Sequence, residues 1–111
     1  LSANQIGDSG VSALASACAN GALAQLQTLF LSRNQIDDSG VSALASACAN
    51  GALPQLEDLN LSYNRIGNDG LIALSKALAD GSLPSCTYIS LYGNPGNDAP
   101  VQEALRNRQN A

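Results

Sequence analysis

The chain has 111 residues, the size of a single domain, and 45% apolar against 13% charged residues is the balance of a globular protein. It contains no His, which excludes Ser-His-Asp and Cys-His catalysis and every His-containing metal site. Nine acidic and five basic residues give a net charge of −4, which argues against a nucleic-acid-binding surface.

The cysteines and the hydropathy pattern bear on the compartment. Cys18, Cys48 and Cys86 are odd in number and have no C-x-x-C spacing, which fits neither a disulfide framework nor a zinc site. The sequence shows no charged leader and no apolar run long enough to cross a bilayer. We therefore expect a cytoplasmic protein that needs no cofactor and does not enter a membrane.

The sequence is a tandem repeat with a period of 30 residues. Residues 1–30 and 31–60 differ at only six positions, and residues 61–90 keep 12 of the 30 residues of the second copy. Residues 91–111 begin a fourth copy and then depart from it. We expect one structural unit per copy, stacked in a single domain over residues 1–111.

In chain order, each unit begins with a strand and continues with a helix. Leu29 and Leu31 stand two positions apart, a period that predicts a short strand with one buried face. The segment Asp38–Ala49 carries apolar residues at helical spacing, which predicts a helix. We assign Asp38 as its N-cap and Gly51 as the glycine that follows its C-cap.

The chain then returns to a second strand, and the unit is repeated. Leu53 and Leu56 anchor the return loop, where Pro54 prevents the helix from continuing. A strand, a helix and a strand at this spacing predict parallel strands joined by crossover helices. The last unit differs, because Gly96 replaces an Ile of the earlier units and the helix at Val101–Arg108 is short and polar.

The pattern L-x-x-L-x-L-x-x-N-x-I stands at Leu26–Ile36 and again at Leu56–Ile66. It resembles the leucine-rich repeat, and the glycine-marked helical half is similar to the ribonuclease-inhibitor-like subtype of NOD-like receptor sensor arrays and Ran GTPase-activating proteins. The resemblance implies an α/β leucine-rich-repeat solenoid, shaped as a horseshoe arc. Parallel strands would line its concave face and helices its convex face, although 30 residues slightly exceeds the usual repeat length.

Several conspicuous residues are expected to serve the framework. An Asn closes each strand, and Asn34, Asn64 and Asn94 are predicted to form a buried ladder that satisfies backbone groups at the turns. Cys48 lies on the helix, and Cys86 takes the place of a framework Leu, so both are expected to be buried.

Two other features have similar structural explanations. Cys18 and Cys48 occupy one helix position in neighbouring units, about 8–10 Å apart, which is too far for a disulfide. The Asp37-Asp38 pair resembles a metal or acid–base pair, but its place before a helix indicates capping.

The strand positions that point away from the predicted core are the candidate recognition surface. Three of the four aromatic residues of the chain fall among them, and a fourth follows a strand end. Aromatic residues and Arg are favoured at binding hot spots. The candidate partner-binding residues are Thr28, Phe30, Arg33, Asp58, Asn60, Tyr63, Tyr88, Ser90 and Tyr92, with Ser32 and Ser62 on the same face.

The sequence thus favours a protein–protein interaction module that is not an enzyme and has no evident small-molecule substrate. Two alternatives stay open: a non-catalytic regulator of an enzyme, such as a GTPase-activating or nuclease-inhibiting array, and a structural spacer. The chain begins within a unit at Leu1, without a polar cap. We therefore expect the C-terminal part of a longer array, and self-association through that open end also stays open.

Overall fold

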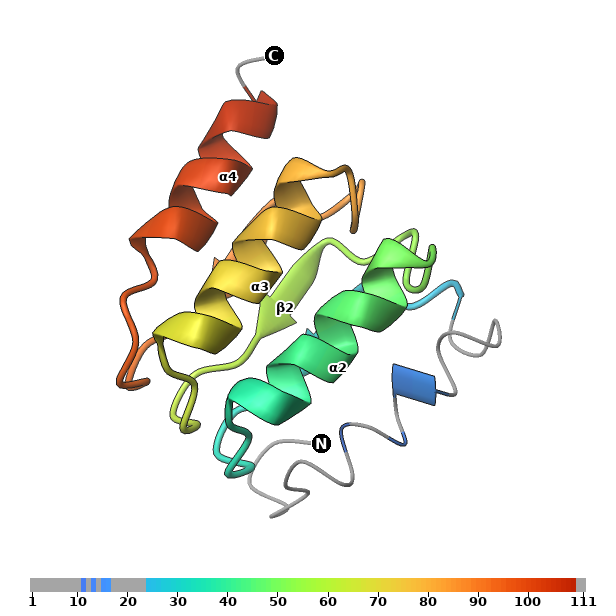
Figure 1. The fold of residues 1–111 in the computed structure, drawn as a ribbon. Helices are drawn as coiled ribbons and strands as arrows, with labels where there is room; N and C mark the ends of the chain where they lie inside the picture. The colour runs from blue at the N-terminus through green and yellow to red at the C-terminus, as the bar shows by residue number, and fades with distance from the viewer. Residues whose placement is uncertain (1–10, 12, 14, 17–23, 110–111) are drawn as a thin grey trace.

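In the computed structural model, the described residues are 11, 13, 15, 16 and 24–109. Three strands alternate with three helices along residues 24–109. The order is β1 (Thr28–Phe30), α2 (Asp38–Ala49), β2 (Asp58–Asn60), α3 (Asn68–Ala79), β3 (Tyr88–Ser90) and α4 (Ala99–Gln109). Figure 1 shows the helices side by side over one face of the strands.

The strands form one parallel sheet in the order β1-β2-β3, which confirms the predicted crossover arrangement. Thr28 pairs with Asp58, and Asp58 pairs with Tyr88, so the aligned residues are 30 positions apart. Packing follows the same order, because α2 contacts α3 and α3 contacts α4. Equivalent residues of successive units therefore lie next to one another.

The core lies between the sheet and the helices and is built from aliphatic side chains. Leu29, Leu59 and Ile89 are the middle residues of the three strands, and all three are buried. Leu53 and Leu83 are buried in the return loops with positive φ values of 54° and 50°. That conformation costs about 1 kcal/mol or more for a residue with a Cβ, and burying a leucine side chain contributes about 1.5–3 kcal/mol, enough to offset it.

The predicted asparagine ladder is confirmed, and it runs from side chain to backbone. Asn64 Oδ1 accepts from the backbone N–H groups of Asn34 (2.8 Å) and Ile36 (3.1 Å). Asn94 Oδ1 accepts in the same way from Asn64 (3.2 Å) and Ile66 (3.0 Å). Asn64 and Asn94 thus each accept hydrogen bonds from backbone N–H groups in the turn of the preceding unit, as the need to pair buried backbone groups requires.

The bounds of α2 agree with the sequence, but the assignment of its N-cap was wrong. Asp37, not Asp38, is the N-cap of α2, and its carboxylate accepts from Ser39 N at 2.9 Å. Asp38 is the first helical residue, and its Oδ1 accepts from Gly67 N (2.6 Å) and Gly70 N (3.0 Å) at the start of α3. The aspartate therefore caps the helix of the next unit, a role that becomes visible only when units are stacked.

The predicted end of α2 is confirmed. Asn50 is the C-cap, and Gly51 follows it with φ +92°, the left-handed conformation that glycine adopts most readily. Gly81 occupies the equivalent place after α3, with φ +96°.

The last helix is longer than predicted, spanning Ala99–Gln109, and an arginine fixes its end. The Arg108 guanidinium donates to the carbonyl oxygens of Leu78 (3.0 Å) and Leu83 (2.7 Å) and also to that of Ser82. The guanidinium thereby provides hydrogen-bond donors for carbonyl groups at and just after the C-terminal end of α3, where the helix dipole also favours a cation.

The cysteine predictions are confirmed where the structure describes them. Cys48 and Cys86 are both buried, and Cys18 lies outside the described residues. Burial raises the pKa of the Cys86 thiol, and this exceeds the opposing effect of a hydrogen bond with the Tyr88 backbone. A thiol in this state is a core side chain and a poor nucleophile.

Candidate functional site

One face of the sheet is turned away from the helices, and we call it the open face. It consists of the candidate strand residues on that side together with the residues that follow each strand. Its side chains lie next to one another across the sheet, since Phe30 pairs with Asn60 and Asn60 with Ser90. Phe30 therefore comes from one outer strand and Tyr88 from the other, with Asp58 and Asn60 on the central strand.

Exposed aromatic side chains gather on this face and its rim. The exposed fraction is 48% for Phe30, 51% for Tyr88, 52% for Tyr63 and 72% for Tyr92. Only one other large hydrophobic side chain in the described part of the chain, Ile72 on α3, is exposed to this degree. Of the remaining candidates, Thr28 and Arg33 are exposed, and Asp58 and Asn60 are half-buried.

Ser90 is the exception among the candidate residues, since it is buried, with 8% exposed. Its hydroxyl lies 2.6 Å from that of Ser62, which is buried as well. A serine side chain is too short to reach solvent between larger aromatic neighbours, and the two hydroxyl groups form a hydrogen bond with each other. Ser90 and Ser62 thus support the sheet, and their prediction as exposed surface residues was wrong.

The ends of the strands carry a stack that sequence reasoning did not find. The Arg33 guanidinium carbon lies 4.4 Å from the centroid of the Tyr63 ring. On the next unit, a Cβ on Gly93 would lie 2.3 Å from that ring, so only a glycine leaves room for it there. Arg33, Tyr63 and Gly93 occupy the same place in successive units, and this equivalence is the signal that the sequence offered.

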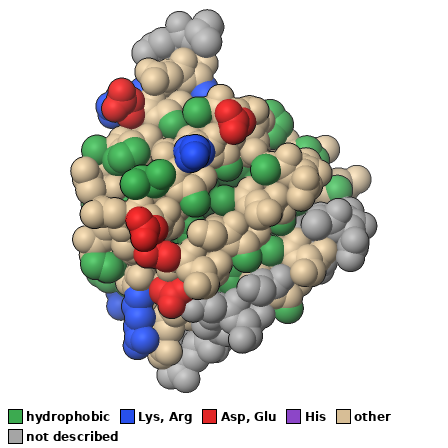
Figure 2. All heavy atoms as spheres, viewed as in Figure 1, with side chains coloured by type: hydrophobic (Ala, Val, Ile, Leu, Met, Phe, Trp, Pro, Cys, Tyr) green, Lys and Arg blue, Asp and Glu red, His purple; other side chains and the backbone are tan. Residues whose placement is uncertain are grey.

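Charge is distributed unevenly along the strands. Glu57 and Asp58 lie where β2 begins, whereas Arg33 and Arg65 follow the ends of β1 and β2. The start of β2 is thus acidic, whereas the opposite end of the sheet carries the two arginines and also the Asp98 carboxylate beyond β3. On the helix side, charged side chains of both signs are scattered among neutral and apolar ones (Figure 2).

A small hollow of about 210 Å³ adjoins the outer edge of β3. Tyr88 and Tyr92 line it from the strand side, and Asp98 and Gln102 line it from the start of the last helix. The Gln102 amide nitrogen donates to the Ile89 carbonyl oxygen (2.9 Å) and to the Asp98 carboxylate (3.4 Å). The glutamine thereby pairs a backbone group at the strand edge and ties Asp98 to the hollow.

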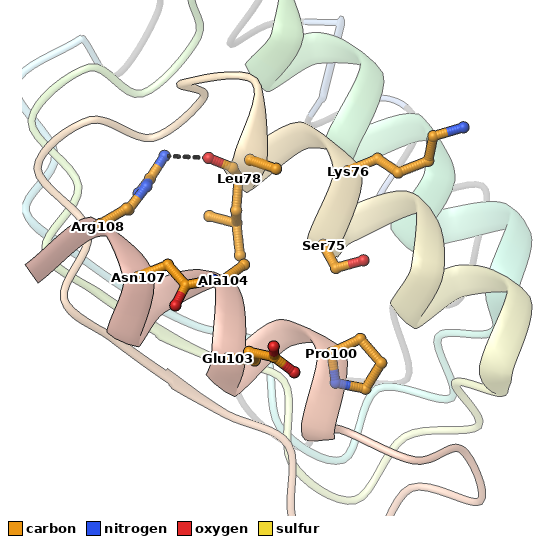
Figure 3. A pocket seen from close by; sticks show the side chains of 9 residues that line it. Ser75, Lys76, Leu78, Pro100, Glu103, Ala104, Asn107 and Arg108 are labelled. Atoms are coloured by element: carbon orange, nitrogen blue, oxygen red, sulfur yellow. Dashed lines mark hydrogen bonds between the residues drawn. The ribbon is translucent and has the colours of Figure 1, made fainter. Parts of the chain in front are cut away.

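A larger cavity of about 560 Å³ lies on the helix side, between α3 and α4. In Figure 3 the side chains of Ser75 and Lys76 come from α3, and those of Pro100, Glu103 and Asn107 come from α4. Arg108 closes one end through its bond to the Leu78 carbonyl oxygen. Its lining mixes two basic side chains and one acidic side chain with polar and small apolar groups and presents no constellation for catalysis.

Two further findings concern only the described residues. None of their helices has the length and apolar character needed to cross a bilayer. No group of three His, Cys, Asp or Glu side chains among them is arranged to hold a metal ion.

Comparison with protein families identifies the repeat. A family model described as "Leucine Rich repeat" matches residues 1–15, 25–45 and 53–75, which together make up more than half of the chain. No curated protein matches the sequence closely. The matched segments contain β1, the first part of α2, β2 and the first part of α3, so they coincide with the stacked units. The chain belongs to the leucine-rich repeat family.

Proposed function

We propose that this chain is a protein-recognition module that binds a partner protein through the open face. Leucine-rich repeat domains generally mediate protein–protein interaction, and the family is typically non-catalytic. The observation that carries the proposal is the gathering of Phe30, Tyr63, Tyr88 and Tyr92 on one side of the molecule, each about half exposed or more.

The residue types on this face support recognition. Aromatic side chains and Arg dominate binding hot spots, because they bury a large area and offer directional contacts at their polar ends. Four of the five exposed large hydrophobic side chains of the described residues belong to the open face or its rim. The half-buried polar side chains of Asp58 and Asn60 lie between Phe30 and Tyr88 and can fix the register of a partner.

Shape adds a second argument. Parallel strands lie about 4.8 Å apart, whereas packed helices prefer about 8–10 Å. A stack that keeps both spacings bends with its strands inside, which would make the open face the concave side of a horseshoe arc. This shape supports a solenoid with a 30-residue repeat as part of the proposal, and the glycine-marked helical half of each unit supports the ribonuclease-inhibitor-like subtype.

A cytoplasmic location is also part of the proposal. The Cys86 thiol is free and buried, as expected where the cellular redox state keeps thiols reduced. A protein partner in that compartment is the ligand that the open face fits best.

The test is an affinity capture with three forms of the chain, read by quantitative mass spectrometry. The combined variant Phe30→Ala, Tyr88→Ala and Tyr92→Ala should lose the partner while changing the free energy of unfolding by only about 1 kcal/mol. The control Ile72→Ala removes an equally exposed hydrophobic side chain from α3 and should retain the partner. Equal capture by the combined variant would refute recognition through the open face.

A further inference from the structure

We infer that the hollow beside β3 is a specificity pocket for one arginine side chain of the partner protein. The inference rests on the proposed function and deepens it, because Tyr88 and Tyr92 belong to both surfaces. Four side chains carry it: the two tyrosines, Asp98 and Gln102.

The size of the hollow matches a single side chain. At about 210 Å³ it is smaller than the roughly 300–1,000 Å³ of pockets that enclose small-molecule ligands. A water molecule takes about 30 Å³ in the liquid, so the hollow holds on the order of seven waters that a side chain would displace. The hollow is open to the surface at Tyr92, which is 72% exposed, so a side chain of a docked partner can enter it there.

The lining selects a planar cation. Tyr88 and Tyr92 contribute aromatic side chains to the lining, and Asp98 contributes a carboxylate. No Lys or Arg lines the hollow, so an anionic side chain that entered it would be repelled by the Asp98 carboxylate without a compensating positive charge. A guanidinium group both stacks on aromatic rings and forms paired hydrogen bonds with a carboxylate, which an ammonium group cannot do as well.

The supporting contacts hold the carboxylate in place. Gln102 bonds to Asp98 and to the Ile89 carbonyl oxygen, so the acidic group is tied to the edge strand before any ligand arrives. The same molecule already shows the pairing that we infer, because Arg33 lies over the Tyr63 ring at 4.4 Å. The net charge of −4 adds a long-range attraction for a basic partner.

The experiment is an NMR titration of the isotope-labelled chain with a short peptide. The probe is a blocked pentapeptide with one arginine between glycines, and its matched control carries citrulline, which has the same shape without the charge. We expect saturable shifts at Tyr88, Tyr92, Asp98 and Gln102 with the arginine peptide only. Equal shifts with the citrulline peptide, or no saturable shifts at these residues, would overturn the inference.

Two variants with the same change in net charge separate the pocket from general electrostatics. Asp98→Asn keeps an oxygen that can accept from Gln102. It should weaken binding of the arginine peptide about tenfold, as expected for the loss of one charged contact. Asp69→Asn, on the first turn of α3, should leave its affinity unchanged within about twofold. If Asp98→Asn binds the arginine peptide with wild-type affinity, the inference of an arginine pocket is overturned.

The same variants distinguish this inference from the proposed function. If the partner protein is lost on combined substitution of Phe30, Tyr88 and Tyr92 but is retained by Asp98→Asn, the open face stands and the arginine pocket does not. If capture withstands the combined substitution, the proposed function itself fails.

Discussion

Asn64 shows how one residue can hold two units together. Its Oδ1 accepts from two backbone N–H groups of the preceding unit, and its Nδ2 donates to the carbonyl oxygens of Leu31, Leu61 and Ser62. The sequence predicted this role, because a polar residue that recurs at the end of every buried strand needs buried partners. The direction of the bonds, from side chain to the neighbouring backbone, depends on the stacking and was not predictable from one unit.

Replacing Asn64 by Ala should therefore cost about 3 kcal/mol in the free energy of unfolding. The substitution leaves several buried donors and acceptors unpaired, each worth about 1–3 kcal/mol. Urea denaturation followed by circular dichroism measures the loss. Asn107→Ala on the exposed surface of α4 is the control, expected within about 0.5 kcal/mol of the wild type. A neutral denaturation midpoint for Asn64→Ala would contradict the ladder.

Cys86 gives a second test at the scale of the residue. Burial raises its pKa in the native state, so the thiolate forms more readily after unfolding. Its contribution to stability is therefore complete below the thiol's ordinary pKa of about 8.5 and is lost as the pH rises through the higher native value. Peptide mass spectrometry should show Cys86 labelled by a thiol reagent at pH 8 only on unfolding. Fast labelling of the native chain would refute its burial.

At the scale of the element, periodicity and the glycine after the helix were reliable guides, but the choice of N-cap was not. The helix expected over Asp38–Ala49 has those bounds, because its apolar side chains must face the sheet at helical spacing. The choice between Asp37 and Asp38 as N-cap could not be made from the local sequence. Both are good capping residues, and only the neighbouring α3 reveals that Asp38 serves Gly67 and Gly70.

This arrangement predicts that a substitution in α2 destabilises the start of α3. Asp38→Ala removes the acceptor for two backbone N–H groups and should cost about 1–2 kcal/mol. Asp38→Asn keeps an oxygen and should cost less than half as much. Hydrogen exchange read by mass spectrometry should show faster exchange at the first turn of α3 in the alanine variant. Unchanged exchange there, or equal losses in the two variants, would show that Asp38 does not cap α3.

At the scale of the whole molecule, the sequence predicted which side carries the exposed aromatic residues but not the detail of that surface. Alternation along each strand places Phe30 and Tyr88 opposite the core, as the structure shows. Ser90 obeys the same alternation, yet its small side chain is covered by its surroundings. The hollow beside β3 depends on Asp98 and Gln102 reaching the edge of the sheet, a contact that no repeat pattern encodes.

The most direct test of the central claim is hydroxyl-radical footprinting of the chain with and without its captured partner. The open face carries reactive reporters in Phe30, Tyr88 and Tyr92, and Ile72 reports on the helix side. We predict that partner binding protects the three aromatic side chains and leaves oxidation of Ile72 unchanged. Protection of Ile72 with unchanged oxidation of the aromatic side chains would place the partner on the helices and contradict recognition through the open face.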